Sequence, residues 1–285
     1  MKKMEKNRIK DIVCQIKQGA IILEGAISVL GVLSADSSRI LTLILKQNAE
    51  NSSGAKKILS AAKAKNIETA VFGPDEMTEF EKSVNGAGFC PLGKSHGGIL
   101  ATAARRKFLS LRELTDVLPR GQKYVSIAVI EGIEDPYNLG YAARAVYTQG
   151  IDALILPERD FGFSEATIEK ASTGTFSKMP AAVFSKDKAS LTQILKSEGF
   201  TIYCIDKESP ANSKAKQTDI FEVKFAARSV FIIGGEKRGI SGDFLAAADE
   251  IVKIPYANAF EHSLAAQSAA TIVSYEIHRQ RAAGK

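Results

Sequence analysis

Short apolar runs alternate with segments of helical spacing along nearly the whole chain of 285 residues. The runs are rich in β-branched residues and bounded by turn residues, which is typical of strands. From residue 124 onward they are almost continuously apolar, as in strands buried on both faces of a parallel sheet. The pattern therefore predicts an α/β protein. Strand-like runs lie at residues 39–46, 66–72, 99–104, 124–130, 153–156, 181–184, 201–205, 230–233 and 250–254.

A charged stretch interrupts this alternation before the middle of the chain. Residues 105–122 (RRKFLSLRELTDVLPRGQ) lack a strong apolar period and end in Pro-Arg-Gly, as linkers do. We therefore predict a smaller N-terminal α/β domain over residues 1–108 and a linker over residues 109–122. A C-terminal domain with a parallel sheet is expected over residues 123–285.

Positive charge gathers in the N-terminal part of the chain. Residues 1–120 hold 19 basic and 12 acidic side chains, whereas the remaining residues hold 19 and 20. Such a surface is compatible with a polyanionic partner. The run of Arg105, Arg106 and Lys107 is our candidate for contact with an RNA backbone, although a short charge run is equally typical of a solvated linker.

Cysteine spacing and hydropathy exclude several classes of protein. Cys14, Cys90 and Cys204 have no C-x-x-C spacing and are odd in number, which argues against a disulfide framework or a zinc ribbon, and we expect no metal site. The longest apolar stretch, residues 20–33, is interrupted by Glu24 and too short to cross a bilayer, so we expect an amphipathic helix there. The N-terminus lacks the features of a secretory signal. We expect a cytoplasmic protein that does not bind membranes.

Two polar motifs follow apolar strands, where a parallel sheet opens towards its ligands. The sequence DPYNLGYAAR at residues 135–144 carries Asn138 and Arg144 at the start of a helix. The sequence IIGGEKRGI at residues 232–240 carries Glu236 and paired glycines, which allow backbone N–H groups to approach a ligand. Taken alone, the first motif is more typical of an N-cap asparagine and a solvated arginine than of a site, and the second is equally typical of a tight turn. The second fits neither a P-loop nor a dinucleotide fingerprint.

A third motif precedes the last helix, which we expect over residues 262–280. Ile254 and Pro255 end a strand, since proline cannot continue the ladder of hydrogen bonds. Ser263 and Leu264 then open the helix, with Ser263 as its N-cap.

The order of these motifs resembles the SpoU/TrmH branch of the SPOUT methyltransferases. The sequence KASTG at residues 170–174 is similar to the family's K-A-S-x-G segment, so the resemblance covers about residues 124–281. Upstream, Glu24-Gly25 and GKSHGG at residues 93–98 are similar to the small substrate-binding domain often fused in front. The resemblance implies a C-terminal α/β domain with a trefoil knot. It also implies a homodimer formed through that domain.

The resemblance also assigns an activity and roles to residues. Members of the family transfer a methyl group from S-adenosylmethionine to a ribose 2′-hydroxyl of ribosomal or transfer RNA. The resemblance implies that four residues bind the cofactor, largely through backbone groups: Gly234, Gly235, Ile254 and Leu264. It implies that four others line a catalytic crevice near the subunit boundary: Asn138, Arg144, Glu236 and Ser263.

The proposed chemistry suits these residue types. A ribose hydroxyl is a very weak acid, so methyl transfer needs proton removal or stabilisation of the developing alkoxide. Arg144 can supply a positive field or hold a phosphate, because a guanidinium keeps its charge and donates in a fixed fork. For the same reason it is a poor base. Orientation of cofactor and hydroxyl contributes much of the remaining rate, and no metal is required.

One position departs from the family pattern. The family usually reads S-L-N where this chain has Ser263-Leu264-Ala265. An alanine side chain can neither donate nor accept, so any hydrogen bond of the asparagine is absent or replaced, with Gln267 and Asn258 as candidates. We predict an active enzyme, and the alternative is a catalytically silent RNA-binding relative. A dehydrogenase, a kinase and a cysteine-dependent base methyltransferase are disfavoured, because their signatures are missing.

Overall fold

The computed structural model of the chain describes residues 2–86, 92–93, 96–162, 164–185, 187–207, 215–235 and 238–284, with side chains from residue 7 onward. Its contacts divide the chain into two compact units. Unit 1 comprises Met1–Lys107 and Asp160–Lys178, and unit 2 comprises Phe108–Arg159 and Met179–Lys285. The domain boundaries given above stay predictions. The division by contacts differs from them because it groups residues 160–178 with the N-terminal part.

Unit 1 is built on a four-stranded sheet. Its elements are α1 (Lys2–Lys17), β1 (Ile21–Glu24), α2 (Gly25–Ala35), η1 (Ser37–Arg39), β2 (Ile40–Lys46), η2 (Ala49–Asn51), α3 (Ser53–Ala64), β3 (Glu68–Phe72), α4 (Pro74–Gly86), β4 (Ile99–Ala103), α7 (Ser164–Ala171) and α8 (Thr175–Lys178). The strand order is β1-β4-β2-β3. β4 is antiparallel to both neighbours, and β3 is parallel to β2. Apolar side chains of α2 and α3 pack on one face of the sheet, and those of α1 and α4 pack on the other.

From its composition we expected the apolar stretch at residues 20–33 to form a single helix. That prediction is wrong. The first part of the stretch is the buried strand β1, which pairs with β4, and α2 begins only at Gly25. Gly25 has a φ of +82°, a left-handed conformation that side-chain-bearing residues rarely adopt and that turns the chain from strand to helix. Periodicity alone cannot separate a short buried strand from a buried helix, which explains the error.

Unit 2 is built on a seven-stranded sheet in which every pair of neighbours is parallel. Its elements are α5 (Leu111–Val117), β5 (Val125–Ile130), α6 (Pro136–Thr148), β6 (Ala153–Pro157), β7 (Ala181–Phe184), α9 (Lys188–Ser197), β8 (Thr201–Ile205), β9 (Lys216–Asp219), β10 (Arg228–Ile233), α10 (Gly242–Ala247), β11 (Glu250–Lys253) and α11 (Ala266–Ala283). The strand order is β7-β6-β5-β10-β8-β11-β9. The predicted α/β fold with a parallel sheet is therefore confirmed, whereas the trefoil knot stays a prediction.

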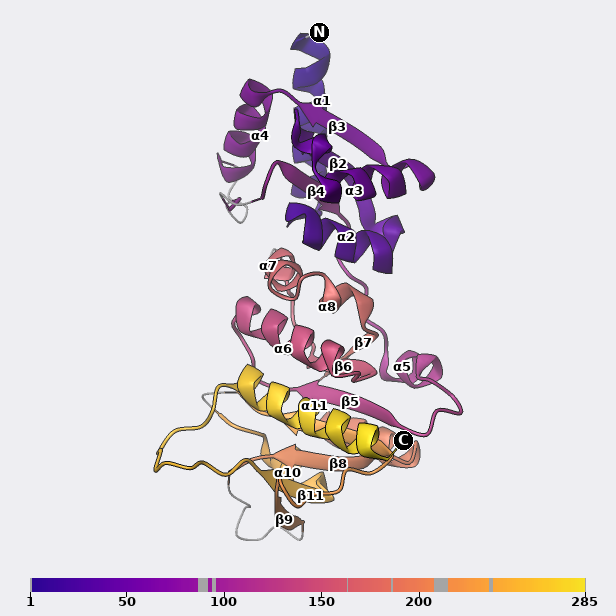
Figure 1. Cartoon of the computed structure of the whole chain (residues 1–285), viewed down its shortest axis with the longest axis vertical. Coiled ribbons are helices and arrows are strands. Elements are labelled where there is room, and N and C mark those ends of the chain that lie inside the picture. The colour runs from indigo at the N-terminus through magenta and orange to yellow at the C-terminus, as the bar shows by residue number, and fades with distance from the viewer. Residues whose placement is uncertain are drawn as a thin grey trace. The chain divides into compact units, whose positions relative to one another are not determined.

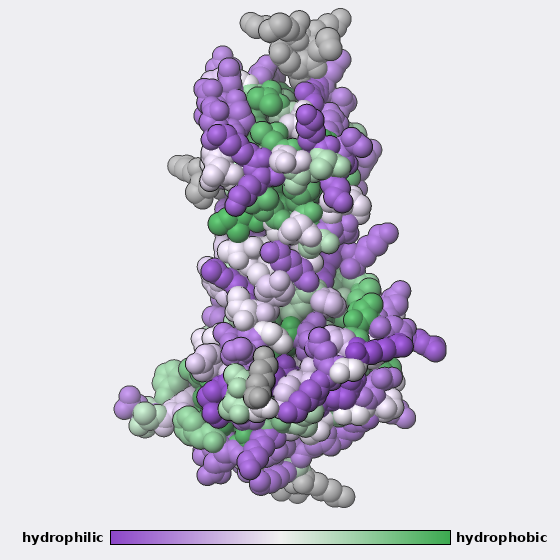
Figure 2. All heavy atoms as spheres, turned by 45° about the vertical axis from the view of Figure 1, so that its right-hand side comes forward, coloured by the Kyte–Doolittle hydropathy of each residue, from purple (hydrophilic) through white to green (hydrophobic). Residues whose placement is uncertain are grey.

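Helices cover both faces of the sheet of unit 2. α6 and α11 lie side by side (Figure 1). The opposite face carries α5, α9 and α10, whose apolar side chains join those of alternate strand residues in one buried cluster. This alternation along each strand follows from the pleat, which points successive side chains to opposite faces. Most of the surface shown in Figure 2 is hydrophilic, with scattered apolar residues.

The stretch that we predicted as a linker contains a helix. Ser110 and Glu113 form a capping box at the start of α5, in which each side chain accepts the backbone N–H of the other residue. Leu114 and Leu118 then pack into the buried cluster of unit 2. The S-x-x-E spacing was visible in the sequence, but the apolar face of α5 is too short to give a clear period.

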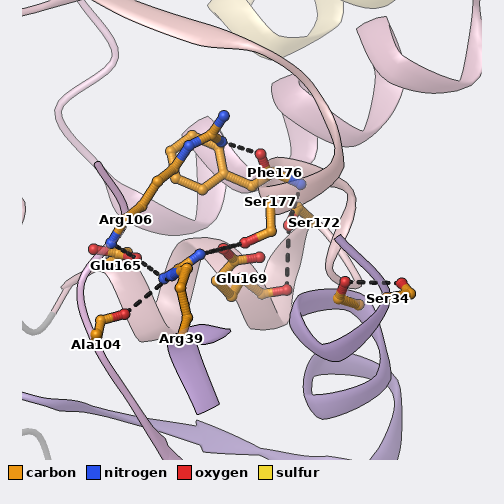
Figure 3. A network of polar contacts seen from close by, with 10 residues as sticks. Ser34, Arg39, Ala104, Arg106, Glu165, Glu169, Ser172, Phe176 and Ser177 are labelled. Carbon is orange, nitrogen blue, oxygen red and sulfur yellow. Dashed lines mark hydrogen bonds and ion pairs between the residues drawn. The ribbon is translucent and has the colours of Figure 1, made fainter. Parts of the chain in front are cut away.

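Two arginines and two glutamates lie close together in the interior of unit 1 (Figure 3). The guanidinium of Arg39 donates to the carboxylate of Glu165 and to the hydroxyl of Ser177, the latter over 2.7 Å. A second nitrogen–oxygen distance of 3.6 Å joins Arg39 to Glu169. The side chains of Arg39, Glu165 and Glu169 are only 8%, 2% and 0% exposed, so α7 is held in unit 1 through buried charges.

The charges of this cluster are incompletely satisfied. Burial raises the pKa of Glu165 and of Glu169, because it disfavours the ionised carboxylate. Among the described residues, no group forms a hydrogen bond with Oε2 of Glu169, although that atom is buried. Arg106 lies over the ring of Phe176 at 4.7 Å, and burial lowers its pKa to about 10. The buried carboxylates of Glu165 and Glu169 therefore depend on both Arg39 and Arg106 for compensation of their charge.

The KASTG segment also lies in unit 1. The ammonium group of Lys170 donates to the carboxylate of Glu24 over 2.8 Å. Gly174 has a φ of +77°, and a Cβ atom at this position would collide with the backbone of Gly31 on α2. Packing against α2 thus explains why a glycine is needed there.

Candidate functional site

A pocket opens at the carboxyl ends of β8, β10 and β11 in unit 2; we call it pocket A. Ligands of open parallel sheets bind at this edge, because the strands there end in loops that side chains and backbone groups can line. The wall contains residues from four segments. They are Ile205, Asp206, Lys207, Ile233, Gly234, Gly235, Gly239, Ile240, Ile254, Tyr256, Ser263, Leu264, Ala266 and Ala269.

All four residues predicted to bind the cofactor line pocket A, and one predicted catalytic residue joins them. Gly234 and Gly235 follow β10, Ile254 follows β11, and Ser263 and Leu264 precede α11. These positions are up to thirty residues apart in the sequence, and the order of the strands brings them together. Their roles stay predictions, but their proximity is a property of the fold.

The paired glycines make a tight turn. Gly235 and Gly239 exchange backbone hydrogen bonds, with N···O distances of 3.3 and 2.9 Å. A Cβ atom on Gly235 would collide with the backbone of Gly132, in the loop after β5, so only glycine fits there. Glu236 lies outside the described residues.

A second pocket, which we call pocket B, adjoins pocket A and shares Gly235 and Gly239 with it. It lies at the carboxyl ends of β5 and β6 and contains both acidic and basic side chains. Its lining residues are Glu131, Gly132, Ile133, Glu134, Asp135, Asn138, Pro157, Arg159, Lys188, Gly235, Arg238, Gly239 and Ser241. Asn138, a predicted catalytic residue, therefore lies in pocket B rather than in pocket A.

Ionic contacts fix part of the wall of pocket B. The ammonium group of Lys188 lies 2.6 Å from Oε1 of Glu131, and Oε2 of Glu131 accepts the backbone N–H of Ser241 over 2.9 Å. Arg159 donates to the carbonyl of Ile133 over 3.0 Å, and burial lowers its pKa. The wall of pocket B thus carries three basic side chains, Arg159, Lys188 and Arg238, beside three acidic ones, Glu131, Glu134 and Asp135.

Arg144 lines neither pocket. It lies on the exposed side of α6, in line with Tyr137 and Tyr141, which are 49% and 50% exposed. The neighbouring helix α11 also exposes apolar side chains, with Ile272 at 37% and Tyr275 at 56%. Within one chain, Arg144 therefore does not share a pocket with Asn138 or Ser263, the other predicted catalytic residues that the structure describes.

The three predicted RNA-binding residues differ in their surroundings. Arg105 is exposed and pairs with Asp160 over 2.9 Å, and Lys107 is exposed. Arg106 instead directs its guanidinium into unit 1, where it donates to the carbonyl of Phe176 (Figure 3). These contacts do not fit the predicted contact of Arg106 with an RNA backbone, because its guanidinium is already bound by groups inside unit 1. For Arg105 and Lys107 the role stays a prediction.

The last helix begins later than expected. Its N-cap is Ala265 rather than Ser263, and no side chain caps it. α11 therefore starts at Ala266, which together with Ala269 contributes to pocket A. The difference arises because residues 255–264 follow a separate loop, which sequence spacing does not reveal.

The family model decides the classification of the chain. The model of the SpoU rRNA methylase family matches residues 126–275, which is more than half of the chain. The chain belongs to the SpoU rRNA methylase family. The matched residues lie in unit 2 except for residues 160–178, and they include both pockets.

Individual relatives of this SpoU family member agree with that classification. A provisionally assigned TrmH family tRNA/rRNA methyltransferase of Staphylococcus epidermidis is 28% identical over 186 residues, which are 65% of this chain and 71% of that protein. The 23S rRNA (guanosine-2′-O-)-methyltransferase RlmB of Xanthomonas campestris is 25% identical over the same shares. Among solved structures, the SpoU methyltransferase AviRb of Streptomyces viridochromogenes with AdoMet is 18% identical. It covers 97% of this chain and 99% of its own with a TM-score of 0.71, which shows the fold.

Other features bear on what this family member can do. Among the described residues, no group of three or more His, Cys, Asp or Glu side chains could hold a metal ion. None of the described helices is both long and apolar enough to cross a membrane. Burial raises the pKa of the Cys204 thiol to about 12. The thiol therefore stays protonated, and this cysteine is a poor nucleophile. Cys90 lies outside the described residues.

Sequence reasoning missed several residues of the two pockets. Asp206 and Lys207 directly follow β8 and line pocket A, so the rule that picked the other strand ends would have found them. In pocket B, Arg159 lies two residues after the end of β6, and Lys188 is the first residue of α9. They have no motif around them, and only the fold places them beside Asn138.

Proposed function

We propose that this chain, an RNA methyltransferase by its family, transfers the methyl group of S-adenosylmethionine to a ribose 2′-hydroxyl of ribosomal or transfer RNA in the cytoplasm. The observation that carries the proposal is pocket A, in which the strand order gathers Gly234, Gly235, Ile254 and Leu264. Pocket B, next to it, supplies the cations and Asn138 that an RNA nucleotide requires.

Pocket A fits the cofactor by the chemistry of its wall. Ile205, Ile233 and Ile240 offer apolar surface for an adenine ring. The carboxylate of Asp206 can accept hydrogen bonds from ribose hydroxyls. The glycine turn exposes backbone groups at close range. S-adenosylmethionine supplies an electrophilic methyl group when bound, and the residues of the chain only have to bind and orient it.

Pocket B suits the methyl acceptor. Arg238 can contact phosphate oxygens, and Asn138 can donate to or accept from a ribose hydroxyl. Because the two pockets share Gly235 and Gly239, a hydroxyl in pocket B lies next to a ligand in pocket A. Holding the two reactants in neighbouring pockets lowers the entropic cost of the reaction.

Arg144 enters this scheme through a homodimer. We infer that the exposed sides of α6 and α11 form the dimer interface, because they present Tyr137, Tyr141 and Tyr275 to solvent. Aromatic and arginine side chains are enriched in such interfaces. Arg144 lies in the same row and would then serve the crevice of the partner subunit. There its guanidinium would stabilise the developing alkoxide or hold a phosphate.

Unit 1 is the proposed RNA-binding part of the chain. The whole positive excess of the chain lies in residues 1–120, and Arg105 and Lys107 are exposed there. Contacts of lysine and arginine with phosphates give affinity without sequence specificity and weaken with salt. The trefoil knot is part of the same proposal and rests on the family to which the chain belongs.

The proposal is tested by methyl transfer. Purified protein is incubated with radiolabelled S-adenosylmethionine and total RNA from cells that lack it, and 2′-O-methylated positions are mapped across the RNA. We expect label at one or a few riboses. Absence of incorporation together with intact cofactor binding would favour the catalytically silent relative. Absence of cofactor binding would reject the proposed function.

Ala269→Phe is expected to block pocket A. Ala269 lies on α11 with its side chain on the pocket wall, and a phenyl ring there would occupy the space of a ligand. We expect the affinity for S-adenosylmethionine to fall by about tenfold or more in a calorimetric titration, since the ring clashes with the ligand. Ala282→Phe, on the exposed end of the same helix, serves as the control and should bind normally.

Ala265→Asn is expected to stabilise the start of α11. Ala265 is an N-cap without a side-chain hydrogen bond, and its φ of −56° and ψ of 137° suit a capping residue. An asparagine there should accept a backbone N–H of the first turn and raise the free energy of unfolding by about 1 kcal/mol. Denaturant titration measures the change. A large gain in turnover as well would show that Ala265 limits catalysis.

A further inference from the structure

The side chain of Tyr256 closes a loop at the wall of pocket A. Its hydroxyl accepts the backbone N–H of Leu264 over 2.8 Å, although the two residues are eight positions apart. Both residues line the pocket, whereas residues 257–262 between them are exposed. The hydrogen bond therefore sits at the neck of a loop whose tip extends into solvent.

Few other contacts with described residues hold this loop. The ammonium group of Lys207 donates to the carbonyl of Glu261 over 3.1 Å, and the rings of Tyr256 and Phe260 lie 6.1 Å apart. Lys207 and Glu261 are both exposed, so their contact competes with water. Tyr256 is half-buried and is the better anchor.

The amide of Leu264 depends on Tyr256 for its partner. The next residue, Ala265, has no side-chain acceptor. Neither Gln267 nor Asn258, the residues considered as replacements for the missing asparagine, is joined to Leu264 by a described hydrogen bond, and Oε1 of Gln267 is buried without one among the described residues. The tyrosine hydroxyl thus fixes the segment that carries Ser263 and Leu264.

We propose that Tyr256 is a positioning residue for the cofactor. Its hydroxyl holds Ser263 and Leu264 in the arrangement that receives S-adenosylmethionine before the cofactor arrives. The inference rests on the proposed function of pocket A. A loop that is already ordered loses less conformational entropy when the ligand binds, and this difference appears as affinity.

Tyr256→Phe tests the proposal, because it removes the hydroxyl and keeps the ring. A neutral hydrogen bond of this kind corresponds to an affinity loss of about threefold to tenfold. We expect the Kd and the KM for S-adenosylmethionine to rise by that factor, with little change in kcat. In the free protein, hydrogen exchange at the Leu264 amide should accelerate, which is a readout independent of activity.

Tyr203→Phe is the matched control. The hydroxyl of Tyr203 also accepts a backbone N–H, that of Ala226, over 2.9 Å in the same unit, but the residue does not line pocket A. Its loss should lower thermal stability to at least the same degree and leave cofactor affinity unchanged. A general weakening of unit 2 would instead reduce affinity in both variants.

The outcomes separate the inference from the function that it rests on. Failure of the unaltered protein to bind S-adenosylmethionine would reject the proposed function. Normal binding by Tyr256→Phe, with normal exchange at Leu264, would reject the positioning role alone. Tighter binding by that variant would also reject it, since the hydroxyl would then compete with the cofactor for the Leu264 amide.

Discussion

Replacing Arg39 by leucine is expected to lower the free energy of unfolding of unit 1 by about 3–5 kcal/mol, the usual cost of removing one partner from a buried ion pair. The variant leaves the carboxylates of Glu165 and Glu169 in the interior without their nearest guanidinium. Leucine fills much of the space, so the loss reports charge rather than a cavity. Denaturant unfolding, followed by hydrogen exchange of β2 and α7, measures the effect.

The loss should depend on pH in a defined direction. Burial raises the pKa of Glu165 and Glu169 in the folded protein, so the cost of burying their charge appears as the pH rises through the folded pKa and vanishes when they are protonated. The deficit of Arg39→Leu should therefore be largest at neutral pH and shrink in acid. A deficit that does not change with pH would contradict this origin.

Arg105→Leu is the control for this experiment. Arg105 also forms an ion pair, with Asp160, but its side chain is 40% exposed and that of its partner is 80% exposed. Exposed pairs contribute about 0–1 kcal/mol, because water screens them. Equal losses in the two variants would mean that burial does not matter in this cluster.

Replacing Arg144 by alanine is expected to lower kcat by about 100-fold to 1,000-fold, as does loss of one preorganised donor in other enzymes. The affinity for S-adenosylmethionine should be unchanged, because Arg144 lies outside pocket A. Single-turnover methyl transfer measures the first quantity and calorimetry the second. Arg120→Ala, at an exposed arginine that pairs only with Asp116 among the described residues, is the control.

Mixing two impaired variants, at a concentration of S-adenosylmethionine well below the weakened Kd of Ala269→Phe, tests whether Arg144 acts in the partner subunit. Arg144→Ala keeps an intact pocket A, and Ala269→Phe keeps an intact Arg144. If Arg144 serves the partner's pocket, each mixed dimer has one complete site, and random mixing restores about a quarter of the activity. If Arg144 acts within its own chain, no mixture exceeds the residual activity of the two variants. A monomer in solution would contradict the arrangement directly.

The sequence predicted the chemistry of strand ends well. Gly234 lies in the second motif and Ile254 and Leu264 lie in the third, and all three residues line pocket A. The reason is physical: in a parallel sheet, every strand delivers its following loop to the same edge. The positions of Gly234 and Ile254 directly after buried strands agree with this rule, whereas the grouping of these residues with Leu264 was predicted from the resemblance to the family.

Other features depend on tertiary contacts that spacing cannot express. Arg106 is part of a charged run, but the ring and the carbonyl of Phe176, seventy residues later, turn it inwards. Arg144 belongs to the same motif as Asn138, yet one lies on the outer side of α6 and the other in pocket B. A helix turns by about 100° per residue, so six positions separate two sides of it.

The course of the chain limits how this protein can be divided. It passes from one unit to the other at residues 107–108, 159–160 and 178–179. The second and third crossings arise because α7 and α8, which belong to unit 1, lie in the sequence between β6 and β7 of unit 2. A fragment that ends near residue 108 would thus keep Arg39 but lack Glu165 and Glu169. The two units are therefore not separable modules. Exchanging unit 1, the proposed RNA-binding part, between relatives would require replacing both of its segments, residues 1–107 and 160–178, together.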